Sequence, residues 1–313
     1  MSMSMPPATV SAEASHIAPQ NGMTLRYFRP AADLFPAITG YHVYGRDERA
    51  TGDERVDWFL PGTANIRILL DAGRVTVTIG KAAFDLPPTS LFGPTTQAMR
   101  ATTHGGYIVG IGISALGWSR LDFGAASDIC DRIVPLDTLA AGSLVAALQG
   151  AVATSDLAGG MVVAIETVMR WAIKPPGEDA GQIAAVMALS VANDHADVGR
   201  AAATLGVSEH TLRRLTMRYF GMMPKLLLRR ARFLRSYLAA IDAGGTLDYK
   251  RIDNGYANVP HFLRDAERFL GMTARRFQAI DTPFLDVSLR ERLAVLGQAT
   301  QALTDISAGR GGG

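Results

Sequence analysis

The sequence of 313 residues is poor in cysteine, with Cys130 as its one example. A single cysteine excludes an internal disulfide and a metal site built from several thiolates, and such usage is typical of a reducing compartment. A reactive thiolate needs a neighbouring base or cation that lowers its pKa, and no motif around Cys130 supplies one. We therefore expect a small buried thiol at this position.

Long uncharged hydrophobic runs are also absent. The most apolar helical stretch, GMVVAIETVMRWAI, is shorter than the roughly 20 residues that cross a bilayer and includes Glu166 and Arg170. The opening residues, MSMSMPPATVSAEAS, have neither the basic region nor the apolar core of a secretion signal. These absences predict a cytoplasmic protein without a membrane partner.

Charge is scarce and unevenly distributed. Charged residues make up 19% of the chain, and the net charge is +2. Residues 1–180 hold 13 Lys+Arg against 17 Asp+Glu, whereas residues 181–280 hold 15 against 8, a net charge of +7. A basic segment behind a neutral or acidic one predicts that the back half meets a polyanion.

The front half shows the period-two pattern of half-buried strands. In RVTVTI, Val75, Val77 and Ile79 fall on one face and two threonines on the other. NIRILL precedes it across DAG, which predicts a hairpin turn. Several short strands separated by Gly and Pro predict a small barrel or a sandwich.

Residues 137–173 read as two helices with an interruption near 155–160, and KPPGED follows as a linker. Beyond it the chain is helical and basic as far as Ile280, and residues 284–307 predict one more helix. The predicted fold class is α+β: a β-barrel or jelly-roll-like domain with helices, then an all-α domain. The predicted boundaries are a disordered tail at 1–22, a barrel-like ligand-sensing and dimerisation domain at 23–173, a linker at 174–180, a DNA-binding domain at 181–280, and a C-terminal helix with a disordered end at 281–313.

One segment is repeated at an offset of fifty. RRLTMRYFGMMPK at 213–225 aligns with LRDAERFLGMTARR at 263–276, and the helix caps Ser208 and Asn258 align upstream. Each copy predicts a capped helix that ends at a glycine. The aligned pairs within and just before the copies are Leu212 with Phe262, Arg214 with Arg264, Arg218 with Arg268, Gly221 with Gly271, and Met222 with Met272.

The first copy predicts a helix with one apolar and one basic face. Its apolar residues, Leu212, Leu215, Tyr219 and Phe220, recur at helical spacing. Upstream, DVGRAAATLGVS supplies a small-residue helix and a Gly-containing turn, which together predict a helix-turn-helix with its second helix in the DNA major groove. The candidate DNA-contacting residues of this copy are His210, Arg213, Arg214, Met217 and Arg218.

The second copy has Phe262, Ala266 and Phe269 as its buried stripe. Between the copies, PKLLLRRARFLRSYLAAI predicts a connecting helix of about 27 Å at 1.5 Å per residue. That length is comparable to one turn of DNA, about 34 Å, so two recognition helices could reach successive major-groove faces. The candidate DNA-contacting residues of this copy are Val259, Pro260, His261, Arg264 and Arg268.

The stretch AAATLGVSEHTLRRLTMRYFGMMPKLLLRRARF, followed by GYANVPHFLRDAERFLGMTARRF, resembles the DNA-binding domain of AraC/XylS-type transcription regulators over about a third of the chain. The resemblance implies base-reading positions at His210, Arg213 and Arg214 in the first helix. In the second helix it implies such positions at Val259, Pro260, His261 and Arg264. It further implies operator or promoter DNA as partner, a small-molecule effector, a homodimer, contact with RNA polymerase and a nucleoid-associated location.

The sequence departs from the family pattern in the helix before Gly255, which reads DYKRIDN. Lys250, Arg251 and Asn254 stand where small or apolar residues are expected. We therefore predict that the second recognition helix is poorly supported and that sequence discrimination resides mainly in the first.

A small-molecule-sensing barrel commonly precedes the DNA-binding domain in this family. The residues that we single out as candidate ligand contacts are Trp58, Arg67, Phe92, Arg100 and Tyr107. A barrel also suits a metal-dependent cupin oxygenase or isomerase, but the front half holds only His16, His42 and His104, with no His-x-His pair. The sequence thus predicts no metal, cofactor or catalysis. A non-specific nucleoid or RNA binder remains a third hypothesis, which the two capped helix-turn-helix motifs disfavour.

Overall fold

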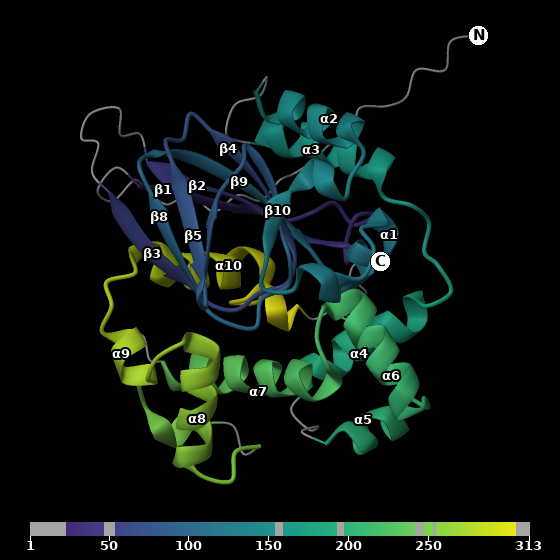
Figure 1. Cartoon of the computed structure of the whole chain (residues 1–313), viewed down its shortest axis with the longest axis vertical. Helices are drawn as coiled ribbons and strands as arrows, with labels where there is room; N and C mark the ends of the chain where they lie inside the picture. The colour runs from purple at the N-terminus through teal and green to yellow at the C-terminus, as the bar shows by residue number, and fades with distance from the viewer. Residues whose placement is uncertain are drawn as a thin grey trace.

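The computed structural model describes residues 23–46, 54–153, 159–192, 197–241, 247–252 and 255–304. Two β-sheets form one part of the molecule and helices form the other (Figure 1). The predicted disordered tail at 1–22 and the predicted disordered end lie outside the described residues, as does Asn254.

All strand pairs in the two sheets are antiparallel. The six-stranded sheet contains, in spatial order, β1 (Met23–Phe28), β2 (Ile38–Arg46), β9 (Gly106–Ile113), β4 (Asn65–Leu70), β7 (Thr89–Phe92) and β10 (Ile133–Pro135). The four-stranded sheet contains β3 (Arg55–Phe59), β8 (Met99–Thr103), β5 (Val75–Ile79) and β6 (Ala82–Asp85). Among the described strands the sheets do not join into a closed barrel, so the jelly-roll-like alternative is the better description.

The turn predicted at DAG is not a hairpin. The strand before it, β4, pairs with β9 and β7, whereas the strand after it, β5, pairs with β8 and β6. Residues 71–73 therefore carry the chain from one sheet to the other, with Asp71 in the left-handed region at φ 47°. The predicted alternation in β5 is confirmed, because Val75, Val77 and Ile79 are buried.

Alternation along β2 divides the core into two sides. Tyr41 and Val43 pack with the helices α2 (Gly142–Ala153) and α3 (Gly159–Ala172) on one face of the six-stranded sheet. Tyr44 points to the opposite face and packs with residues of the four-stranded sheet. The chain's two predicted helices over 137–173 thus cover the outside of the larger sheet (Figure 1).

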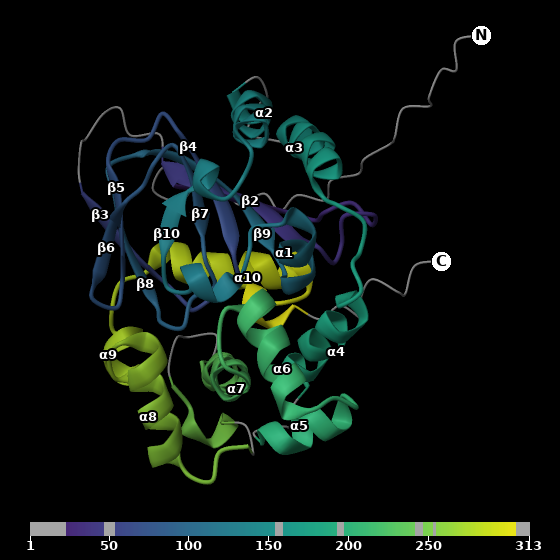
Figure 2. The ribbon, with the colours of Figure 1, turned by 45° about the vertical axis from the view of Figure 1, so that its right-hand side comes forward.

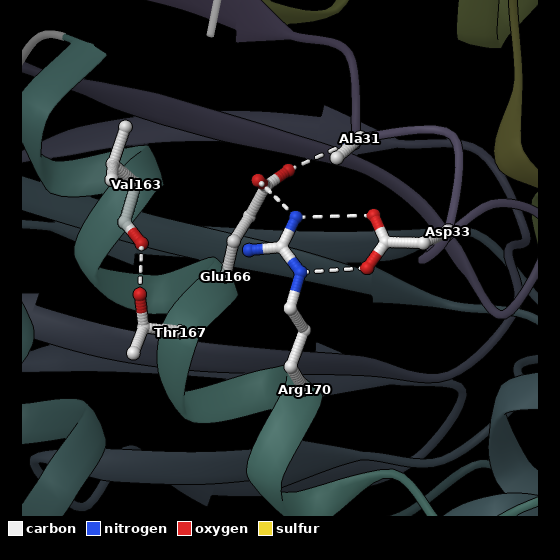
Figure 3. A network of polar contacts seen from close by, with 6 residues as sticks. All are labelled: Ala31, Asp33, Val163, Glu166, Thr167 and Arg170. Carbon is white, nitrogen blue, oxygen red and sulfur yellow. Dashed lines mark hydrogen bonds and ion pairs between the residues drawn. The ribbon is translucent and has the colours of Figure 1, made fainter. Parts of the chain in front are cut away.

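A polar network fixes α3 to the loop before β2 (Figure 3). The side chain of Glu166 is buried and accepts a hydrogen bond from the backbone N–H of Ala31 at 2.7 Å. Arg170 donates to Asp33 at 2.6 Å and to Glu166 at 3.3 Å. The hydrogen bond from Arg170 lowers the pKa of Asp33. These contacts fix the position of α3 relative to the sheet.

The chain then passes through a mainly helical region. A short helix, α1 (Ala115–Leu121), and the 3-10 turns Ala126–Ile129 and Leu136–Thr138 precede α2. After α3 come α4 (Ala180–Val191), α5 (Val198–Thr204), α6 (Glu209–Leu215), a π-helical turn (Thr216–Phe220), α7 (Pro224–Ala240), a 3-10 turn (Tyr249–Arg251), α8 (Val259–Leu270), α9 (Ala274–Gln278), α10 (Pro283–Leu296) and a 3-10 turn (Gln301–Leu303). The predicted α+β class is confirmed, with two helix-turn-helix motifs joined by α7. None of the described helices is both long and apolar enough to cross a membrane.

Helix α10 follows the second helix-turn-helix in sequence but returns to the sheets, where it lies between the strands and α7 (Figure 2). The Tyr27 hydroxyl and the Ser288 hydroxyl are hydrogen-bonded at 2.6 Å, and the backbone N–H of Phe284 donates to Asp57 at 3.2 Å. Phe284 and Val295 join the core between the two sheets. Sequence analysis predicted this helix but not its place.

Candidate nucleic-acid interface and ligand cavity

The first helix-turn-helix consists of α5 and α6. The Ser208 side chain caps α6 by accepting a hydrogen bond from the N–H of Thr211 at 3.1 Å, as predicted. Ala201 of α5 is fully buried and shares a hydrophobic cluster with Leu212 and Leu215 of α6. Gly206 forms the turn at φ 64°, a conformation that a side chain disfavours.

The opposite face of α6 is open. His210, Arg213, Arg214 and Arg218 are exposed, and Met217 is half-buried on the π-helical turn. Arg214 is held by the linker, because it donates two hydrogen bonds of 3.0 Å to the carboxylate of Asp179. Tyr219 donates to the same carboxylate at 2.8 Å. The Arg214 hydrogen bonds lower the pKa of Asp179, so the carboxylate is ionised at neutral pH.

The second recognition helix, α8, repeats this construction. Asn258 caps it by accepting from the N–H of His261 at 2.9 Å, and Phe262, Ala266 and Phe269 are fully buried. The helices of both copies end at a left-handed glycine, Gly221 at φ 76° and Gly271 at φ 73°. The predicted cap, stripe and terminator of the repeat are therefore confirmed.

The outward face of α8 is formed by residues of the predicted set. Val259, Pro260, Arg264 and Arg268 are exposed. His261 is half-buried, with its ring 5.2 Å from that of Tyr256. The structure thus brings the second group of candidate residues together on one helix, as it does the first.

A buried carboxylate anchors α8 from below. Asp265 is fully buried and accepts a hydrogen bond from the Tyr256 hydroxyl at 2.8 Å. Arg229 and Arg232 of α7 both form ion pairs with it. Arg232 also lies 4.4 Å from the centre of the Tyr256 ring. Sequence analysis missed this network, although a single acid in the buried stripe of a helix is a pattern that could have drawn attention.

The prediction that the second recognition helix is poorly supported stays a prediction, and the structure shows which described residues pack beneath that helix. The segment before Gly255 includes a 3-10 turn, Tyr249–Arg251, in place of an α-helix. Lys250 and Arg251 are exposed and take no packing positions, while Tyr249 and Ile252 pack against the core under α8. Support for α8 comes from these residues and from α7.

The connecting helix α7 holds both motifs and also contacts the sheets. Its 17 residues span about 25 Å at 1.5 Å per residue. Arg230 is buried and donates to the carbonyl oxygens of Thr95 at 2.7 Å and Gly62 at 2.9 Å. Burial lowers the pKa of Arg230 to about 10, which leaves it charged at neutral pH. Through this side chain α7 is attached to two loops of the sheet region.

Those loops form part of the wall of a cavity. It lies beside α10 and contains about 800 Å³ of space, including its opening to solvent. Its lining is mostly apolar with several polar groups. The lining residues are Leu25, Tyr27, His42, Tyr44, Phe59, Leu60, Pro61, Gly62, Thr63, Asn65, Arg67, Phe92, Gly93, Thr95, Met99, Phe284, Leu285, Ser288, Leu289, Arg292, Ala299, Thr300 and Gln301.

Two of the five candidate ligand residues line this cavity. The Arg67 guanidinium lies 4.2 Å above the Phe92 ring and donates to the Tyr44 hydroxyl at 2.9 Å. The other three lie outside the lining. Trp58 packs on Phe277 of α9, at 5.8 Å between ring centres. Tyr107 packs on the α2–α3 side of the sheet, and Arg100 is half-buried on β8.

Two polar lining residues, His42 and Arg292, were not among the candidates. The His42 ring lies 5.7 Å from that of Tyr27 and 5.6 Å from that of Tyr44. Gly110 makes room for it, since a Cβ there would lie 2.0 Å from His42 Nε2. Burial lowers the pKa of His42 well below its usual value, with Arg67 and Arg292 adding to the effect. The imidazole is therefore neutral at physiological pH.

Among the described residues, no group of three or more His, Cys, Asp or Glu side chains could hold a metal ion. Cys130 is half-buried, and burial raises the pKa of its thiol to about 12. It is thus a protonated thiol, although it is less buried than predicted.

No protein-family model matches the chain, and no curated protein sequence matches it. Among solved structures, ToxT from Vibrio cholerae is similar at 12% identity and a TM-score of 0.41, over 83% of this chain and 98% of that one. The AraC-like transcriptional activator CuxR is similar at 12% identity and a TM-score of 0.24, over 74% and 81%. A cupin-2 domain from Rhodospirillum rubrum is similar at 8% identity and a TM-score of 0.23, over 35% and 75%. Similarities this low define neither fold nor function.

Proposed function

We propose that this chain is a sequence-specific DNA-binding protein. The observation that carries the proposal is a pair of recognition helices, α6 and α8, that are built alike and attached to the two ends of one helix (Figure 1). Each recognition helix is capped, buries an apolar stripe, is followed by a left-handed glycine and leaves arginines exposed. Exposed arginines on such helices suit guanine edges and phosphates.

More specifically, we propose a transcription regulator of the AraC/XylS type that acts at operator or promoter DNA in the cytoplasm. The motif sequence of the repeat and the net charge of +7 over residues 181–280 support this assignment. Arg213 and Arg214 are proposed to read bases from α6, and Arg264 to read them from α8. Contact with RNA polymerase is part of the same proposal.

The first prediction is that the full chain binds duplex DNA with a steep salt dependence. Four to six phosphate contacts give a slope of about −3.6 to −5.4 in a plot of log K against log salt. Selection of sites from random duplexes is expected to yield one motif that spans two successive major grooves. Fluorescence anisotropy at several salt concentrations measures the slope. A flat salt response, or no enriched motif at moderate salt, would contradict the proposed function.

A small-molecule effector is proposed to occupy the cavity between the sheets and α10. Gly62 and Thr95 line that cavity, and their carbonyl oxygens are the acceptors of Arg230 on α7. An occupant that moves either loop would therefore act on the helix that carries both motifs. The described lining holds one imidazole and no carboxylate, a composition that suits binding better than metal-dependent catalysis.

A homodimer is proposed to form through the outer face of α3. Val163, Thr167 and Trp171 lie along one exposed stripe, and Trp171 is 65% exposed. A large exposed aromatic on the same stripe as an exposed valine is unusual for a surface that stays in water, and aromatic residues are enriched at the centres of interfaces.

The second prediction follows from that stripe. Replacing Trp171 with glutamate is expected to weaken self-association at least about tenfold, because it places a charge in an apolar contact. Sedimentation at micromolar concentration measures the change. Leu293→Glu on α10 is the matched control, because Leu293 is 54% exposed and lies away from α3. A monomeric wild type, or an equal loss of self-association in both variants, would contradict the proposed α3 interface.

A further inference from the structure

Two arginines in the cavity are buried without a counter-ion. Arg67 on β4 is 7% exposed and Arg292 on α10 is 3% exposed. Neither forms an ion pair with any described carboxylate, and no Asp or Glu is present among the cavity's described lining residues. Burying an unpaired charge is costly, so such a pair calls for an explanation.

Their hydrogen-bonding capacity is also largely unused. A guanidinium carries five N–H donors. Arg292 reaches one carbonyl, that of Thr39, at 3.4 Å, and its Nε and Nη1 have no partner. Arg67 reaches the Tyr44 hydroxyl, and its Nε has no partner. Around them, His42 Nδ1, Asn65 Oδ1 and Thr300 Oγ1 are likewise buried and unpaired.

Two other described arginines, Arg230 and Arg232, are also buried and also have an unpaired Nε, but their remaining contacts are stronger. Arg230 donates to two carbonyl oxygens at 2.9 and 2.7 Å, and Arg232 pairs with Asp265. The two cavity arginines therefore differ from these in having neither a carboxylate partner nor two carbonyl acceptors.

Arg67 and Arg292 line the same cavity. Each lies near enough to His42 to disfavour its protonation, and His42 projects into the cavity wall between Tyr27 and Tyr44. The remaining walls are mostly apolar and include the aromatic rings of Phe59, Phe92 and Phe284. An occupant that complements this lining has an anionic group and an apolar body.

We propose that Arg67 and Arg292 together form a binding site for a small organic anion, whose carboxylate lies between the two guanidiniums and whose apolar body lies against the aromatic wall. This inference deepens the proposed function and rests on it for the role of the occupant as effector. It makes α10 a part of the ligand site. The ligand then joins β4 of the sheet to α10, which follows the second helix-turn-helix and α9 in the chain.

The test uses the full chain and three probes of matched shape: 3-phenylpropanoate, 3-phenylpropanol and 3-phenylpropylamine, with inorganic phosphate as a fourth. Binding is followed by calorimetry and by the rise in Tm. The propanoate is expected to bind and raise Tm, whereas the alcohol, the amine and phosphate are not. Equal effects of the acid and the alcohol, or binding of phosphate alone, would overturn the proposal.

Variants separate a ligand role from a structural one. Arg292→Met and Arg67→Met are each expected to weaken propanoate binding about tenfold or more, since each removes charge-assisted hydrogen bonds. Each is also expected to leave the ligand-free Tm unchanged or higher, because a buried unpaired charge is removed. Arg290→Met on the exposed side of α10 is the control and is expected to change neither quantity.

A lower ligand-free Tm with propanoate binding retained would show that the arginines are structural and would overturn the site. If Arg67→Met fails to fold, Arg292→Met decides by the same two measurements, and Arg292→Lys, which keeps the charge, is expected to restore part of the binding. DNA binding is measured separately on a selected duplex. Sequence-specific DNA binding with no anion binding overturns this inference alone, whereas anion binding lost in the variants of a protein that binds no DNA supports the site and overturns the proposed function.

Discussion

Replacing Asp265 with alanine is expected to lower the free energy of unfolding by about 3–5 kcal/mol, the usual effect of removing one partner of a buried ion pair. The substitution leaves Arg232, whose side chain is 10% exposed, and the Tyr256 hydroxyl without their acceptor. Arg229 is 31% exposed and can turn to water, so the loss of its ion pair contributes less to the destabilisation. Urea denaturation of the full chain, followed by circular dichroism, measures the loss.

Two further variants give this prediction its controls. Asp265→Asn keeps an acceptor for Tyr256 but removes the charge. Its free energy of unfolding is expected to lie between those of the wild type and Asp265→Ala. Glu267→Ala changes an exposed acid on the same helix and is expected to cost less than about 0.5 kcal/mol. If Asp265→Ala is as stable as Glu267→Ala, the network does not support α8.

Replacing Arg213 or Arg264 with alanine is expected to cost about 1–3 kcal/mol of affinity on a selected duplex, and much less on a scrambled one. The expectation is the same for both residues because α6 and α8 are held with comparable firmness, each capped and each packed through fully buried side chains. Anisotropy titrations on both duplexes at two salt concentrations measure specificity and slope separately.

Arg214 is expected to behave differently from Arg213, because Asp179 holds it in the structure. Asp179→Asn should raise DNA affinity by a few-fold, the modest size expected from releasing a partly exposed ion pair. Arg74→Ala is the control, because it breaks the exposed ion pair between Arg74 and Asp85. It should leave DNA affinity unchanged. Loss of specificity in Arg213→Ala without any loss in Arg264→Ala would restore the hypothesis that the first motif alone reads bases.

Local rules account for what the sequence predicted well. Caps at Ser208 and Asn258, left-handed glycines at Gly221 and Gly271, and the buried stripes of α6 and α8 all follow from residues within a few positions of each other. The proposed reading positions Arg213, Arg214 and Arg264 lie on these helices and are exposed, and their contact with DNA stays a prediction.

The contacts that could not be predicted from the sequence are those between residues far apart in the chain. The strand β4 was expected to pair with β5 next to it, but its partner β9 begins at Gly106. Asp265 stands in the apolar stripe of α8, but its partners Arg232 and Tyr256 belong to other segments that no local pattern brings to it. Arg67 and Phe92 line the cavity, but three other aromatic or basic strand residues chosen with them do not, and Arg292 belongs to a helix that no local pattern ties to the sheets.

The return of α10 to the sheets has a consequence for the order in which the molecule is made. The ribosome adds residue 173 about 110 residues before it adds Pro283. At usual rates of synthesis this interval is on the order of 5–20 s. During that time the groups that Phe284 and Val295 will cover remain in water, Tyr44 and Tyr27 among them. The sheets of a nascent chain are therefore unfinished until both helix-turn-helix motifs have been synthesised, and a truncated product lacking α10 would carry an open apolar surface that favours chaperone binding or aggregation.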